Sequence, residues 1–93
     1  MNILEKANEL VNGERQVDYG DPKHNHKRIA NLWEAYLTGC GIPCCLQPHD
    51  VAIMMMLMKV ARLMNTPGHE DTWVDIAGYA QVGQWCTEVD KNE

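Results

Sequence analysis

The chain has 93 residues, which is enough for one domain, and we expect residues 1–93 to form a single helical unit. Its net charge is −5, whereas proteins that bind long nucleic acids rely on clustered Lys and Arg, so the charge argues against that class of function. It leaves room for a small phosphorylated ligand, and a chain this short buries only about two-thirds of its unfolded surface, which favours association between copies.

The first predicted element is an amphipathic helix near the N-terminus. Its apolar stripe stops near Asn12 and Gly13, a typical C-terminal signal. The stripe consists of Ile3, Leu4, Ala7, Leu10 and Val11. The opening sequence MNILEKANEL has charged residues where a signal peptide carries an apolar stretch, so we expect no such leader.

The second helix is predicted to begin in the polar stretch VDYGDPKHNHKR, with Asp21 as N-cap and Pro22 as first helical residue. Its apolar residues keep helical spacing as far as Gly39. The free N–H groups at such a helix start favour anions. The simpler alternative is an ordinary capped helix whose polar side chains are solvated, namely His24, His26 and Lys27.

Three side chains around this helix start have the chemistry to bind a phosphorylated nucleotide. The ring of Tyr19 can stack on a base, and the amide of Asn25 can hydrogen-bond to the edge of that base. The guanidinium of Arg28 is a permanently charged fork that fits a phosphate.

Cysteines cluster in the next loop, GCGIPCCLQ, and a fourth lies at position 86. This uneven spacing does not fit a secreted disulfide framework, so we expect free thiols in a reducing cytoplasm. Together with His49 the loop offers donors for zinc. However, the spacing C-x3-C-C-x3-H lacks the second separated pair of a structural zinc site, so we expect no metal there.

The third predicted helix runs from Pro48 to about Asn65 and holds five of the six methionines. Its eight consecutive apolar residues, 51–58, are too few for a membrane span, which needs about 20. Consecutive methionines point in different directions on a helix, which disfavours a soft-metal site. Because the first two turns are apolar on every side, we expect burial partly by another copy, with Met54 to Met58 at the interface of a dimer or tetramer.

The fourth helix is expected from about His69 to Trp85, and no stretch of the chain alternates as a strand would. Its predicted inner face consists of Trp73, Ile76, Ala77 and Ala80. The sequence therefore predicts an all-α protein with four helices in one bundle.

Charged residues on the third and fourth helices could face one another. Asp71 and Asp75 share one face, which Tyr79 continues, and Lys59 and Arg62 share a face of the third helix. Buried cations usually need a partner. These residues form either a polar ligand pocket or a structural lattice of salt bridges that sets the register of the helices.

Three segments carry a resemblance to known proteins: ERQVDYGDPKHNHKRIANLWEAYL, LQPHDVAIMMMLMKVARLMN and DTWVDIAGYAQVG. Their patterns YGDPxxN, RIAxLW, DVAxMMxxxKxAR and WxDxAGY resemble a small family of phage and prophage proteins, from Glu14 to Gly83. That family is similar, more loosely, to MazG-like all-α nucleotide pyrophosphohydrolases. The resemblance implies a MazG-like homo-oligomer in the cytoplasm of an infected bacterium, with a nucleotide bound between helices.

The metal-binding residues of MazG-like enzymes are only partly matched. Those enzymes hold Mg²⁺ through an ExxE pair and an ExxD pair, because a hard cation beside a triphosphate needs several carboxylate oxygens. Here the second helix offers Glu34, with Asn31 three residues earlier, and the third helix offers Asp50. On the fourth helix Asp75 matches the final Asp, but Thr72 stands in the Glu position.

The function that we favour is sequestration of a phosphorylated nucleotide without cleavage, with no cofactor and no membrane contact. A host anti-phage defence signal is one candidate ligand. The alternative is a Mg²⁺-dependent nucleoside triphosphate pyrophosphohydrolase, and a helical interaction protein without a small ligand is a third possibility. The residues expected to contact the nucleotide are Tyr19, Asn25, Arg28, Lys59, Arg62, Asp71, Asp75 and Tyr79.

Overall fold

The computed structural model describes residues 1–13 and 21–88. This part of the chain contains four α-helices and no strand, which confirms the all-α prediction. The helices are α1 (Ile3–Asn12), α3 (Pro22–Gly39), α4 (Pro48–Asn65) and α5 (Glu70–Thr87). None of these helices is long and apolar enough to cross a membrane.

Local sequence signals set the helix starts. Asn2 caps α1, and its side chain accepts a hydrogen bond from the backbone N–H of Glu5 at 2.9 Å. Asp21 caps α3 as predicted, accepting from the N–H of Lys23 at 2.8 Å, and Pro22 is the first residue of the helix. Each cap satisfies an N–H group that has no partner within the helix.

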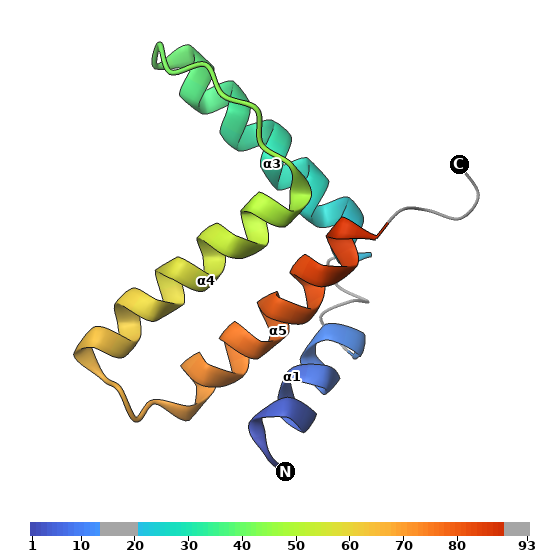
Figure 1. Cartoon of the computed structure of the whole chain (residues 1–93), viewed down its shortest axis with the longest axis vertical. Coiled ribbons are helices and arrows are strands. Elements are labelled where there is room, and N and C mark those ends of the chain that lie inside the picture. Colours follow the sequence, from blue (N-terminus) through green and yellow to red (C-terminus); the bar gives the residue numbers. More distant parts are fainter. Residues whose placement is uncertain (14–20, 89–93) are drawn as a thin grey trace.

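The helices α4 and α5 form an antiparallel hairpin (Figure 1). Lys59 of α4 lies beside Asp75 of α5, with Nζ and Oδ2 2.9 Å apart. Nearer the other end, a Cβ atom added to Gly83 would lie only 3.0 Å from the Cβ of Ala52. The absence of a side chain at position 83 therefore lets the two backbones approach closely.

Helix α1 packs against α5 (Figure 1). A Cβ atom on Gly78 would lie 3.5 Å from a methyl group of Val11, so these helices also meet at a glycine. At the surface, Nζ of Lys6 lies 2.8 Å from a carboxylate oxygen of Glu70. The buried apolar residues are small: Ala7, Val11, Ala30, Val51, Ala52, Val74 and Val82.

The inner face of α5 differs from the prediction. Trp73 is 45% exposed and Ala80 is exposed, whereas Val74, Gly78 and Val82 are buried at a spacing of four residues. Val11 of α1 lies against Gly78 on this side of the helix, and the indole N–H of Trp73 donates to the carbonyl oxygen of Pro67 at 2.9 Å instead of turning inward. Packing against the neighbouring helices therefore decides the buried face here, more than side-chain size does.

Only the first half of α3 is packed in the helix assembly. His26 and Ala30 are buried, whereas Leu32 and Tyr36 are 69% and 71% exposed, and the second half of the helix projects away from the others (Figure 1). The radius of gyration of the Cα atoms is 14.4 Å, against about 12 Å for a compact chain of this length. The arrangement thus departs from a compact four-helix bundle at this end.

Within one chain, α3 and α5 cover only part of the surface of α4, and its burial by another copy stays a prediction. Its buried residues are Val51, Ala52 and Lys59. Its exposed apolar residues are Ile53, Met54, Leu57, Met58, Val60 and Met64. Four of them, at positions 53, 57, 60 and 64, follow helical spacing and form one continuous stripe, which we call the outer α4 stripe.

Candidate functional site: a cavity between the helices

A cavity of about 430 Å³ lies where α1, α3, α4 and α5 meet. Its volume falls in the range of small-molecule sites, about 300–1,000 Å³. Four of the eight residues predicted to contact a nucleotide line this cavity: Asn25, Lys59, Asp75 and Tyr79. Residues that are far apart in the sequence, from four helices, are thus brought to one place.

Apolar side chains form most of the remaining wall. They are Leu10, Val11, Pro22, Ile29, Met55, Met58, Val74 and Val82. A largely apolar cavity with a few polar groups is typical of sites that hold a small organic ligand.

The ion pair between Lys59 and Asp75 is the charged feature of the wall. The two side chains are 11% and 19% exposed, and their charged atoms are 2.9 Å apart, which confirms the predicted contact between these two residues. A buried charge needs such a partner, since desolvation of an isolated ion is very costly. Because the two charges cancel, the pair adds polarity to the cavity without adding net charge.

The ring of His26 is part of the same wall, so the simpler alternative, in which this side chain is solvated, is wrong for His26. The residue is 6% exposed, and its Nδ1 lies 3.0 Å from the carbonyl oxygen of Pro22. Its Nε2 is buried and has no hydrogen-bond partner among the described residues. Burial lowers the pKa of His26, although the hydrogen bond to the Pro22 carbonyl opposes that shift.

The position of His26 could have been found from helix periodicity. Pro22, His26 and Ala30 are spaced by four residues, and the side chain of Ala30 is buried, so the histidine lies on the inward stripe of α3. Its ring also lies near that of Tyr79, with centroids 6.4 Å apart and planes tilted by 54°. Because the neighbouring residues in the sequence are polar, this inward stripe was not identified from the sequence.

The remaining predicted residues are not brought to the cavity. Arg28 and Asp71 are exposed and are not among its lining residues, and Tyr19 lies outside the described residues. Arg62 lines a separate hollow of about 270 Å³ at the turn between α4 and α5.

The predicted contact of Arg62 with an acidic residue is wrong. The pairing of Lys59 with Asp75 sets a register in which Thr72 lies opposite Arg62, and Thr72 lines the same hollow. Within residues 1–13 and 21–88 no ion pair involves Arg62. One turn of helix therefore separates a paired cation from an exposed one.

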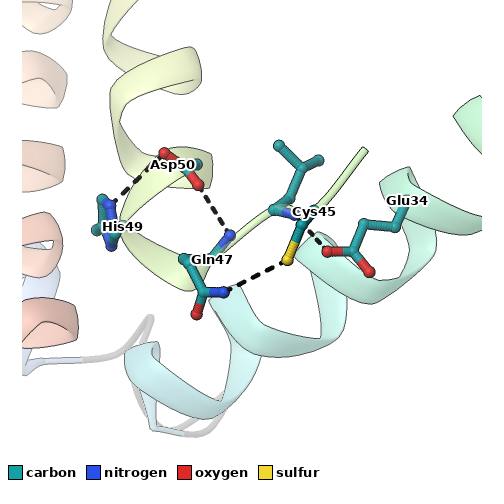
Figure 2. Close-up of polar contacts among 6 residues, drawn as sticks. Glu34, Cys45, Gln47, His49 and Asp50 are labelled. Carbon is teal, nitrogen blue, oxygen red and sulfur yellow. Dashed lines mark hydrogen bonds and ion pairs between the residues drawn. The ribbon is translucent and has the colours of Figure 1, made fainter. Parts of the chain in front are cut away.

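Two carboxylates that were candidate metal ligands bind backbone amides instead (Figure 2). Asp50 accepts a hydrogen bond from the N–H of Gln47 at 2.8 Å, which caps the start of α4. Glu34 accepts a hydrogen bond from the N–H of Leu46, and this bond links the α3–α4 loop to α3. In the part of the chain that the structure describes, no three His, Cys, Asp or Glu side chains lie close enough together to hold a metal ion.

All four cysteines are free. Those at positions 40, 44 and 45 are exposed in or beside the α3–α4 loop. Cys86 is half-buried on α5, and burial raises the pKa of its thiol.

Comparisons with known proteins show to which family the chain belongs. The family described as "Domain of unknown function (DUF6378)" matches residues 2–87. The chain is also similar to the Gene 55 protein of Mycobacterium phage L5, at 55% identity over 82 residues, which are 88% of this chain and 50% of that protein. For the Gene 55 protein of Mycobacterium phage D29 the identity is 44% over 79 residues, 85% of this chain and 49% of that protein.

The chain thus spans about half the length of the curated relatives that it matches. No solved structure matches it. The family match extends over all four described helices, α1 to α5. The chain therefore belongs to the DUF6378 family.

Proposed function

We propose that this protein binds a phosphorylated nucleotide in the cavity between its helices and sequesters it without cleavage. The observation that carries the proposal is the gathering of Asn25, Lys59, Asp75 and Tyr79 around a largely apolar cavity of about 430 Å³. Apolar walls suit the faces of a base, and the polar groups can fix its orientation. The similarity to mycobacteriophage proteins supports a role during infection, in which a nucleotide signal of host defence is a candidate ligand.

The phosphate groups would lie outside the cavity, because the lining carries no uncompensated charge. Arg28 is the predicted phosphate ligand, but it is exposed and is not among the residues that line the cavity. A second copy could supply its own Arg28 at the mouth, so this proposal includes a site shared between subunits.

The outer α4 stripe supports such an assembly, which we propose to be a dimer or tetramer with a MazG-like arrangement of helices. Ile53, Leu57 and Met64 of this stripe are 50%, 62% and 82% exposed, and it contains no charged residue. An uncharged stripe can pack against the same stripe of a second copy about a two-fold axis. Its burial would remove an exposed apolar surface that single subunits rarely keep.

Retention without cleavage is favoured by the positions of the acidic residues. Asp50 caps the start of α4, whereas Asp71 is exposed at the start of α5. In the antiparallel register these two positions are separated by most of the length of α4, about 20 Å at 1.5 Å per residue. Asp75 is paired with Lys59. A Mg²⁺ ion held by several carboxylates would require these groups to converge, so hydrolysis is the alternative and not the proposal.

Calorimetry tests the proposal with nucleoside monophosphates, triphosphates and cyclic nucleotides, each in EDTA and in Mg²⁺. We expect binding in EDTA that weakens as salt rises, since exposed cations hold the phosphate. The bound nucleotide should be recovered intact after the protein is denatured. Arg28→Ala should weaken binding, and Lys27→Ala, its exposed neighbour, serves as the matched control.

Two results would contradict the proposal. Release of pyrophosphate that requires Mg²⁺ would favour the hydrolase. No heat from any nucleotide would favour an interaction protein without a small ligand.

A further inference from the structure

We infer that His26 recognises the base: its Nε2 accepts a hydrogen bond from an N–H group of a nucleobase-sized nitrogen heterocycle held in the cavity. His26 was not among the residues predicted to bind a ligand. The inference rests on the proposed function only for the phosphate part of the ligand, because a heterocycle without phosphate could occupy the same place.

The tautomer of His26 follows from its backbone contact. The carbonyl oxygen of Pro22 can only accept a hydrogen bond, so Nδ1, 3.0 Å away, must carry the hydrogen. In the neutral ring Nε2 is then an acceptor with a free lone pair. Nε2 is at the distal edge of the ring, on the side away from its own helix backbone.

This acceptor is unsatisfied among the described residues, although the residue is only 6% exposed. Buried polar atoms are nearly always hydrogen-bonded, and one that is not has a free-energy cost that a suitable donor can remove. His26 lines the cavity, and Nε2 itself has almost no accessible surface, so a donor that enters the cavity reaches it when the side chains that cover it move aside. The missing partner is therefore a donor, with N–H or O–H, rather than another acceptor; the methylated bases below distinguish a base N–H from a hydroxyl group.

The character of the cavity selects a base over a phosphate as the occupant. An unprotonated Nε2 repels phosphate oxygens, which are acceptors as well, and the nearby charges of Lys59 and Asp75 cancel. The thioether side chains of Met55 and Met58, on the same wall, are flexible and pack well against aromatic rings. A flat heterocycle with one N–H aimed at His26 satisfies all of these features.

The test compares the four ribonucleoside monophosphates, and the corresponding nucleosides, with counterparts whose base N–H groups are all methylated. Calorimetry with the full chain should show about ten- to a hundred-fold weaker binding of the methylated compounds. In His26→Leu this preference should fall to within about two-fold, because the acceptor is gone while the apolar wall remains. His24→Leu, on the exposed side of the same helix, is the matched control and should keep the preference.

A second measurement does not depend on the folding of a variant. In the wild-type chain labelled with ¹⁵N in its histidines, the Nε2 resonance of His26 should show a non-protonated nitrogen that shifts when AMP, GMP, CMP or UMP binds. Binding of a nucleotide with no shift and no loss of preference in His26→Leu would overturn this inference and leave the proposed function intact. Nucleosides that bind through His26 with no gain from phosphate would support the inference and overturn the proposed function. No binding of any compound would overturn both.

Discussion

Removal of one partner from the Lys59–Asp75 pair should strongly destabilise the fold. The two side chains are 11% and 19% exposed, so Asp75→Ala leaves the ammonium group of Lys59 largely buried without a counter-charge. Loss of one member of a buried pair costs about 3–5 kcal/mol, and the residual exposure places this site near the lower end, at about 3 kcal/mol. For a domain of this size that corresponds to a fall in Tm of about 12–24 °C.

Thermal unfolding followed by circular dichroism measures this effect. Glu88→Ala is the control, because Glu88 is exposed at the end of α5 and its side chain forms no ion pair within the described residues. The double variant Lys59→Met with Asp75→Leu replaces the pair by apolar groups and should recover most of the lost stability. Equal Tm values for Asp75→Ala and Glu88→Ala would refute the buried-pair reasoning.

Three further predictions concern assembly, pH and packing. Light scattering at micromolar concentration should give a dimer or tetramer, and Leu57→Lys in the outer α4 stripe should shift it towards a 10.6 kDa monomer; a wild-type monomer would contradict the proposed assembly. Burial lowers the pKa of His26 in the folded protein below the pKa of the same histidine in the unfolded chain. The unfolded state therefore binds more protons than the folded state on acidification. The free energy of unfolding should then fall as pH drops below about 6.5, by at most about 1.4 kcal/mol per pH unit, and this contribution should be absent in His26→Leu. Gly78→Ala should stabilise α5 by about 0.5–1 kcal/mol, since the new Cβ meets Val11 at an ordinary 3.5 Å, yet weaken nucleotide binding because Gly78 lines the cavity. Unchanged binding in Gly78→Ala would place the ligand elsewhere.

The helix boundaries were predictable because they depend on local chemistry. The N-cap at Asp21, the proline at the start of α4 and the end of α1 at Asn12 each follow from a few adjacent residues. The buried face of α5 was not predictable in this way. It depends on which residues of α1 and α4 pack against Gly78 and Gly83, and those contacts join residues that are far apart in the sequence.

The residues of the candidate site were also only partly predictable from the sequence. Helix periodicity predicted that Lys59 and Asp75 lie on facing sides of α4 and α5, and in the structure they form an ion pair. The same reasoning placed Arg62 with an acid, because sequence spacing does not fix the register between two helices. His26 was missed because a polar sequence around it indicated solvent, whereas the turn of α3 carries it inward. Tertiary packing, not residue type, therefore decided which polar side chains line the cavity.

For the proposed nucleotide ligand, the strength of binding depends on whether one chain or two form the site. Burial of a base the size of a large apolar side chain contributes about 1.5–3 kcal/mol, and the hydrogen bond to His26 adds about 1–3 kcal/mol. Their sum, at most about 6 kcal/mol, is short of the roughly 8 kcal/mol that a micromolar Kd requires. Effective sequestration therefore needs one or two charged hydrogen bonds to phosphate, each about 1.5–3 kcal/mol, and Arg28 is not among the residues of its own chain that line the cavity. The monomeric Leu57→Lys variant should bind AMP, GMP, CMP or UMP about ten- to a hundred-fold more weakly than the wild type in calorimetry, although position 57 is not among the cavity-lining residues. Equal affinity of the monomer and the oligomer would show that a single subunit completes the site.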